Sequence, residues 1–93
     1  MKMLSPPHPG RILKNEICLQ GRSVAEIANH LWVDPAIFSS ILSEQAAVTP
    51  EMSRKLAKVL NTPPDLWYRL QEQYDEWRQH RQRRQHQLHH QHQ

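Results

Sequence analysis

The stretch from Ser23 to Ser43, SVAEIANHLWVDPAIFSSILS, constrains the fold more than any other part of the chain. It reads as two helical segments of about eight residues, each with its apolar positions on one face, separated by a break at Trp32-Val33. A connection of three or four residues does not let two such helices lie side by side over a long contact. The segment therefore predicts two short helices that cross at a steep angle.

Capping residues mark where the helices begin. Ser23 with Glu26 three residues later forms a capping-box pattern, and Asp34 is followed by Pro35 at the first helical position. Thr49-Pro50 repeats the pattern of a cap followed by proline. These signals predict helices that start near residues 24, 35 and 50.

Helical spacing of apolar residues extends over the rest of the chain, and no run alternates apolar and polar residues as a half-buried strand would. We expect one more helix from near Gly10 to near Gly21 and another from about Leu66, with Asn61 as a left-handed stop between the fourth and fifth. The predicted fold is all-α, with five short helices, and the fifth can run on into the Arg/Gln stretch as a C-terminal helical extension because both residue types favour helix. The expected inward residues are Ile12, Leu13, Ile17, Cys18, Leu19, Ile27, Ala28, Leu31, Phe38, Ile41, Leu42, Met52, Leu56, Val59 and Leu60.

The steep pair has the pattern of a helix-turn-helix unit. Such a crossing needs a small residue where the second helix passes over the first, and Ala28 lies at that place. With Phe38, Ile41 and Leu42 turned inward, 100° per residue fixes the outer face of the second helix. The candidate base-facing residues on it are Pro35, Ala36, Ile37, Ser39, Ser40 and Ser43.

This outer face suggests contact with double-stranded DNA in the major groove. Serine can bond base edges or phosphates, while alanine and isoleucine can touch a thymine methyl. The face carries no Arg, Lys, Gln or Asn, so we expect modest sequence specificity, with shape and phosphate contacts contributing more. Candidate phosphate contacts are Arg22, Ser23, Gln45 and the N-terminus of the helix that begins near Pro35. The alternative is a solvated surface on a protein-interaction domain of the same shape.

The chain's basic character lies in its last sixteen residues. Residues 78–93 hold four Arg, five His, six Gln and one Leu, whereas residues 1–77 carry 8 basic and 9 acidic residues, a net charge of −1. We expect an extended segment at 1–7, a folded domain at 8–77, and a tail at 78–93 that is partly helical and then disordered.

Composition narrows the function classes. Apolar runs are too short for a membrane span, and no signal-peptide pattern opens the chain, so we expect a cytoplasmic protein. Cys18, the single cysteine, excludes an internal disulfide and is expected to be buried. The tail histidines lack fixed partners and His8 and His30 read as local hydrogen-bonding residues, so we expect no metal and no cofactor. No phosphate-binding loop or nucleophile pattern is present, so we expect no enzyme.

Large apolar residues follow one stripe of the last helix, at positions Leu66, Trp67, Leu70, Tyr74 and Trp77. Part of this stripe must cover the domain's own core. The rest predicts a two-fold helix-to-helix dimer, which would also present two reading helices about one turn of DNA apart.

The chain resembles the HigA-type antitoxins, also called the VapI group, of the Cro/phage-repressor-like helix-turn-helix superfamily. The resemblance covers 70 of 93 residues, from His8 to Trp77. Its motifs are HPGRIL at 8–13, SVAEIANHLWVDPAIFSSIL at 23–42 and VTPEMSRKLAKVLNTPPDLWYRLQEQYDEW at 48–77. The last motif is the most specific, through Thr49, Arg54, Leu56, Ala57, Thr62, Pro64, Leu66, Trp67, Leu70, Gln71, Tyr74, Asp75 and Trp77.

The resemblance implies a homodimer that binds operator DNA, represses its own operon and neutralises a RelE-like mRNA-cleaving toxin. Either the acids Glu72, Asp75 and Glu76 or the segment at 8–13 is a candidate toxin surface, although the acids also suit a solvated helix face. Two alternatives stay open: a protein-binding antitoxin or adaptor with weak or lost DNA binding, and a solitary phage-type repressor.

The chain departs from the family pattern at three places. Trp32 stands where the family usually has glycine, so either the turn is reshaped or the indole covers an apolar neighbour. Ile37 replaces a basic residue, and Ser43-Glu44-Gln45 replaces Asn-Gly-Lys. These changes remove two routes to a phosphate or guanine contact, for which the arginine-rich tail could compensate through salt-sensitive attraction to phosphates.

Overall fold

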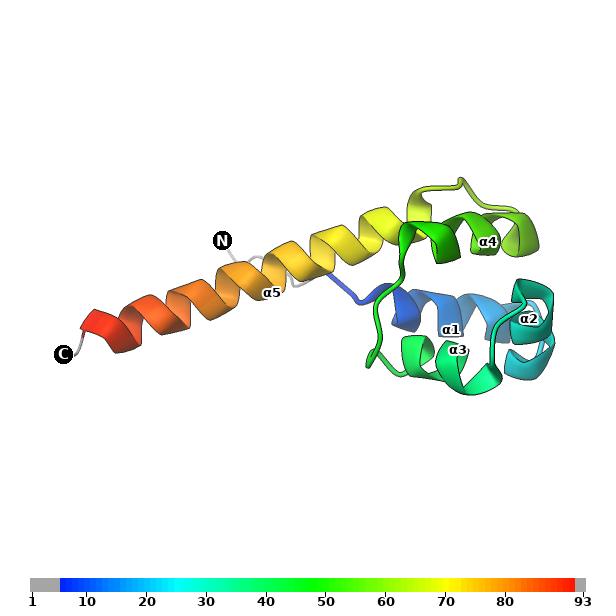
Figure 1. Ribbon diagram of the computed structural model, residues 1–93, viewed down its shortest axis with the longest axis horizontal. Coiled ribbons are helices and arrows are strands. Elements are labelled where there is room, and N and C mark those ends of the chain that lie inside the picture. Colours follow the sequence, from blue (N-terminus) through cyan, green and yellow to red (C-terminus); the bar gives the residue numbers. More distant parts are fainter. Residues whose placement is uncertain (1–5, 92–93) are drawn as a thin grey trace.

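The computed structural model describes residues 6–91, with side chains described as far as Arg81. It confirms the predicted all-α class with five helices (Figure 1), and the part described holds no strand. The helices are α1 (Pro9–Leu19), α2 (Val24–Leu31), α3 (Pro35–Leu42), α4 (Pro50–Leu60) and α5 (Leu66–Gln91). Helices α1 to α4 and the start of α5 make the folded body, from which the rest of α5 projects (Figure 1).

The predicted caps begin the three middle helices. Side-chain oxygens of Ser23, Asp34 and Thr49 each accept a hydrogen bond, at 2.8–3.2 Å, from a backbone N–H in the first turn that follows. Each bond satisfies a donor that the helix itself leaves without an acceptor. At α1 the cap is an imidazole, because Nδ1 of His8 accepts from the N–H of Gly10 at 2.9 Å.

The first four helices all end with the same backbone arrangement. A left-handed residue, with φ between 59° and 69°, lies one or two positions past the last residue of each helix. The N–H one residue further on then bonds to a carbonyl five residues back, at 2.9–3.2 Å. Only one of the four left-handed residues is glycine: they are Gly21, Trp32, Glu44 and Asn61.

Trp32 corrects both expectations for the turn between α2 and α3. The backbone is not reshaped, since Trp32 keeps the left-handed conformation with φ 60° and ψ 39°. The indole does not cover an apolar neighbour either, because the residue is 89% exposed. A side chain with a Cβ is strained in this conformation, so the helix end retains a glycine-like shape at a cost in free energy.

The core fills the space between the helices. The predicted inward residues of α2 and α3 are buried, but Cys18 and Leu19 are exposed, which corrects the expectation that they face inward. Both follow Ile17 by one and two helical steps, which turns them away from the core side of α1. The buried apolar residues are Leu13, Ile17, Ile27, Ala28, Leu31, Phe38, Ile41, Leu42, Val48, Leu56, Leu60 and Trp67.

The fifth helix is 26 residues long, so it is not short like the others and forms the expected C-terminal helical extension. The first turns of α5 pack against the body of the domain. Trp67 is 2% exposed, and Oε1 of Gln71 accepts a hydrogen bond from the N–H of Val48 at 2.9 Å. Ser53 on α4 accepts from the N–H of Tyr68 at 3.1 Å. The helix then continues to Gln91, and the last two residues of the predicted tail lie outside the described residues, as do residues 1–5.

Replacing Trp32 by glycine is expected to raise the free energy of unfolding by about 1 kcal/mol, because glycine adopts the left-handed conformation without strain. Trp32→Ala is the matched control, since it removes the indole but keeps a Cβ at positive φ. Urea denaturation of both variants measures the effect. An equal gain in the two variants would assign the effect to the exposed indole and not to the backbone.

Candidate nucleic-acid interface

Small residues let α3 pack closely against α1 and α2. Ala28 on α2 is fully buried, at the place where the sequence pattern puts the crossing. On α1, a Cβ built on Gly10 would overlap the backbone carbonyl oxygen of Ile41, so this position requires glycine. Three buried residues, Phe38, Ile41 and Leu42, hold α3 in place from its inner side. The turn of three residues and these contacts give the predicted helix-turn-helix unit.

The opposite side of α3 faces solvent, as the 100° geometry predicts. Pro35, Ala36, Ser39 and Ser43 are exposed and Ser40 is half-buried. Ile37 is 55% exposed, a large value for a branched apolar side chain. The exposure predicted for this face is confirmed, whereas its role in reading DNA stays a prediction.

Two of the three serines use their hydroxyl hydrogens within α3. Ser40 Oγ donates to the carbonyl of Ala36 at 2.9 Å, and Ser43 Oγ donates to the carbonyl of Ser40 at 3.2 Å. Their oxygens keep lone pairs that accept hydrogen bonds. Ser39 makes no such bond to the described residues, so its hydroxyl is available as donor and acceptor.

At the N-terminus of α3, which the sequence suggests as a phosphate site, the first N–H groups already have acceptors within the protein. Pro35 has no N–H, the N–H of Ala36 bonds to Oδ1 of Asp34 at 2.8 Å, and the N–H of Ile37 bonds to the Asp34 carbonyl at 2.9 Å. The first turn is therefore satisfied by Asp34, whose carboxylate also places a negative charge there.

Arg22, a candidate phosphate contact, is turned toward the body. Its Nη1 donates to the carbonyl of Val59 at the end of α4, at 3.2 Å, and its Nε lies 3.8 Å from Oε2 of Glu26. The side chain is 25% exposed. Arg22 thus closes the end of α4, which sequence spacing could not reveal because the two residues lie 37 positions apart.

Ser23 and Gln45 remain accessible. Ser23 is exposed and its Oγ accepts from the N–H of Glu26, which leaves the hydroxyl hydrogen free to donate. The N–H groups of Val24 and Ala25 in the first turn of α2 have no acceptor within the helix. This helix end can therefore offer several donors to one phosphate, and Gln45 is exposed at the far end of α3.

The predicted dimer stripe divides into two parts. Trp67 belongs to the domain core, where its Nε1 donates to Oγ1 of Thr62 at 3.0 Å. The other members, Leu66, Leu70, Tyr74 and Trp77, are half-buried, so each keeps apolar surface in solvent. The guanidinium of Arg78 lies 5.9 Å from the ring of Tyr74, and that of Arg81 lies 5.5 Å from the ring of Trp77.

His8, whose role as a helix cap the sequence pattern does not reveal, joins this stripe to α1. The His8 ring is 3% exposed and meets the Tyr74 ring edge to face, with centroids 4.9 Å apart. Burial lowers the pKa of His8 below its ordinary value of 6.5, and Arg78 acts in the same direction. Glu44, Asp75 and a backbone hydrogen bond at Ala46 oppose that shift without cancelling it. His8 is therefore held neutral, which keeps Nδ1 free to accept from Gly10.

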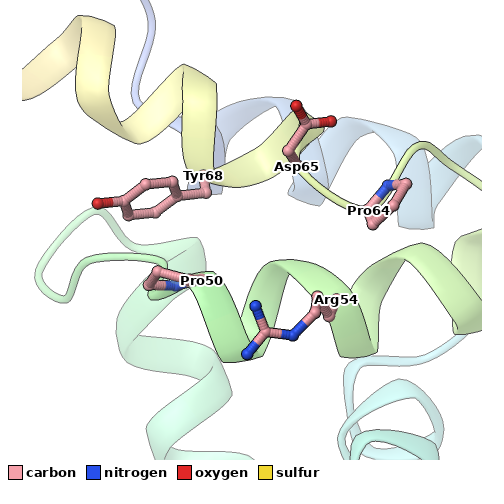
Figure 2. Close-up of a pocket in the computed structure, with 5 residues that line it drawn as sticks. All are labelled: Pro50, Arg54, Pro64, Asp65 and Tyr68. Carbon is pink, nitrogen blue, oxygen red and sulfur yellow. The ribbon is translucent and has the colours of Figure 1, made fainter.

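A small open pocket of about 150 Å³ lies between α4 and the start of α5 (Figure 2). Tyr68, Pro64 and Asp65 line it from one side and Pro50 and Arg54 from the other. The carboxylate of Asp65 is paired with Arg69, since its Oδ2 lies 2.7 Å from Nε of that residue. No residue of α3 lines the pocket, so it is separate from the candidate DNA face.

Among the described residues, no group of three or more His, Cys, Asp or Glu side chains is arranged to hold a metal ion. No helix in the same part of the chain has the length and apolar character needed to cross a membrane.

Comparison with known proteins finds relatives of one kind. The chain is 37% identical over 71 residues to the uncharacterized HTH-type transcriptional regulator YddM of Escherichia coli (strain K12), covering 76% of each protein. An addiction module antidote protein of a HigA family from Coxiella burnetii superposes with a TM-score of 0.72 at 34% identity, over 77% of this chain and 79% of that one.

A third relative was solved with DNA. The Pseudomonas aeruginosa antitoxin HigA with the higBA promoter superposes with a TM-score of 0.82 at 27% identity, over 90% of this chain and 92% of that one. No protein-family model matches the chain.

The buried His8 predicts how stability changes with pH. Its pKa is lowered in the folded state, so its contribution to stability is complete above pH 6.5 and is lost as the pH falls through the folded-state pKa. His8→Asn keeps a capping acceptor that does not titrate, so the free energy of unfolding should fall less between pH 7 and pH 5 than in the wild type. His30→Asn, at an exposed site on α2, is the control, and an unchanged pH profile in His8→Asn would contradict the prediction.

Proposed function

Because this chain belongs to the HigA-type antitoxins, the VapI group of helix-turn-helix proteins, we propose that it binds operator DNA, represses its own operon and neutralises a partner toxin. The observation that carries the DNA-binding part is the solvent-exposed outer face of α3, held outward by the buried Phe38, Ile41 and Leu42. The related Pseudomonas aeruginosa antitoxin solved with its promoter supports the same role. The proposed activity is binding and not catalysis, and its place is the cytoplasm, where operator DNA lies.

The proposed DNA contacts come from two helices. Pro35, Ala36, Ile37, Ser39, Ser40 and Ser43 on α3 would face base edges, and Ser23 with the free N–H groups of α2 would hold a phosphate. Gln45 would add a contact at the other end of α3. Arg22 would act indirectly, by fixing the turn before α2 against α4.

The proposed dimer forms through the half-buried part of the α5 stripe, Leu66, Leu70, Tyr74 and Trp77. The exposed remainder of these side chains is apolar surface that a second copy would remove from water. In this arrangement residues 8–77 form the DNA-binding and dimerisation unit, residues 1–7 precede it, and residues 78–93 are a basic tail that attracts phosphates.

The proposed partner toxin is a basic, RelE-like mRNA-cleaving protein. Family membership supports it, together with the exposed carboxylates of Glu72, Asp75 and Glu76 on α5. The segment at 8–13 is less accessible, because His8, Pro9, Gly10 and Leu13 are buried. Copurification with the product of an adjacent short, basic reading frame tests this part, and failure of the two to bind would remove it.

A second candidate, an antitoxin with weak DNA affinity, has its own support. The N-terminus of α3 is occupied by Asp34, and the guanidinium of Arg22 is engaged by Val59. Both observations lower the number of cations and donors that phosphates can use.

Ser39→Glu is expected to weaken binding to the chain's own promoter region about tenfold or more, because a carboxylate would enter the groove between phosphates. Gln73→Glu is the matched control, since it adds the same charge at an exposed site on α5. Fluorescence anisotropy with labelled promoter DNA measures affinity, and thermal melting checks the fold. Equal affinities of Ser39→Glu and Gln73→Glu would exclude α3 as the reading helix.

Trp77→Glu is expected to convert the protein from dimer to monomer in sedimentation equilibrium, since it places a charge on the apolar stripe beyond the domain core. Promoter affinity should fall with it, because one half-site is then bound at a time. Gln73→Glu again serves as the control. A Trp77→Glu protein that sediments like the wild type would place the dimer contact elsewhere.

A further inference from the structure

We infer that this chain selects its operator through thymine methyl groups, which Ile37 reads together with Ala36. The inference rests on the proposed DNA-binding function and names the chemistry of the same face. It follows from the hydrogen-bonding groups and the apolar surface that α3 offers to a base pair. It also follows from the hydroxyl hydrogens and N–H groups of α3 that are already bonded within the protein.

Hydrogen-bond donors are scarce on this face. The hydroxyl hydrogens of Ser40 and Ser43 point to helix carbonyls, and the first N–H groups of α3 bond to Asp34. Guanine presents two acceptors, N7 and O6, in the major groove and therefore requires donors from the protein. Among the described base-facing groups, Ser39 is left to supply one.

Acceptors and apolar surface are plentiful instead. The oxygens of Ser40 and Ser43 keep lone pairs, which suit the amino group of adenine. Ala36 is exposed, and Ile37 is one of three large apolar residues exposed in the part described. An A·T pair offers an amino donor and a methyl group side by side, which this combination fits, whereas the two guanine acceptors of a G·C pair find few partners.

Ile37 is suited to a specific contact because its shape is fixed before binding. A β-branched side chain in a helix has one strongly preferred χ1 rotamer, so it loses little freedom when it packs against a methyl group. Its exposed surface has no partner within α3, since the core is filled by Phe38, Ile41 and Leu42 from the other side. Burying one methyl group against it should change affinity about fourfold.

The charges beside α3 agree with this reading. From His30 to Thr49 the chain carries Asp34 and Glu44 and no Lys or Arg. A carboxylate at each end of α3 disfavours the guanine acceptors and phosphates near it. Attraction to phosphates must then come from other helices, while α3 contributes selectivity through contact with methyl groups.

The test uses a duplex that the full-length protein selects from a random library. Each thymine in the selected half-site is replaced by deoxyuridine, which lacks only the methyl group, and affinity is measured by fluorescence anisotropy. Replacement at the contacted positions should weaken wild-type binding about fourfold for each methyl. Ile37→Ala should bind the thymine duplex correspondingly less well and should lose no further affinity on the deoxyuridine duplex.

Two control variants accompany it. Ile37→Val keeps the branch and should give an intermediate loss, and Ser39→Ala should keep the full sensitivity to deoxyuridine. Thermal melting checks that the exposed substitutions leave the fold intact.

Several results would overturn the inference. Wild-type binding that is indifferent to deoxyuridine, equal sensitivity in wild type and Ile37→Ala, or a selected site without thymine would each do so while leaving DNA binding in place. Failure to select any duplex would overturn the proposed function as well. A loss of toxin binding by Ile37→Ala with unchanged DNA binding would assign Ile37 to a protein contact.

Discussion

The close packing of α3 against Gly10 of α1 constrains how the rest of the molecule is arranged. Gly10 on α1 leaves no space for a Cβ beside the carbonyl of Ile41, and Ala28 on α2 is fully buried. With the helix held this closely from both sides, its rotation is fixed, and the same three residues always face the core. The chemistry presented to solvent is therefore a direct result of which residues follow one another between Pro35 and Ser43.

Much of this arrangement could be predicted because its causes are local. A helix cap acts over two or three residues, and an amphipathic face repeats every three or four, so both are visible in a single stretch of sequence. The sequence therefore predicts the caps Ser23, Asp34 and Thr49, the stop at Asn61 and the outward face of α3. The fold class follows from these elements, since five amphipathic helices leave few ways to build one core.

The features that could not be predicted depend on contacts between distant residues or on competing small energies. The bond from Arg22 to Val59 joins residues far apart in the chain, and it withdraws a cation that spacing alone would assign to DNA. At Trp32 the chain could either keep a strained left-handed backbone or form a different turn. The hydrogen bonds at the end of α2 outweigh the strain. The serines were visible as residue types, but the direction of their hydroxyl hydrogens follows from the helix backbone around them.

The imidazole cap on α1 has one more consequence. His8 touches Tyr74 of α5 on one side and the N–H of Gly10 on the other, and Gly10 lies directly against the carbonyl of Ile41. Three contacts in series thus connect the surface proposed for subunit pairing with the helix proposed to enter the groove. A displacement of α5 by a bound protein would reach α3 through these contacts. The last of them is at Gly10, a position that tolerates no added atom.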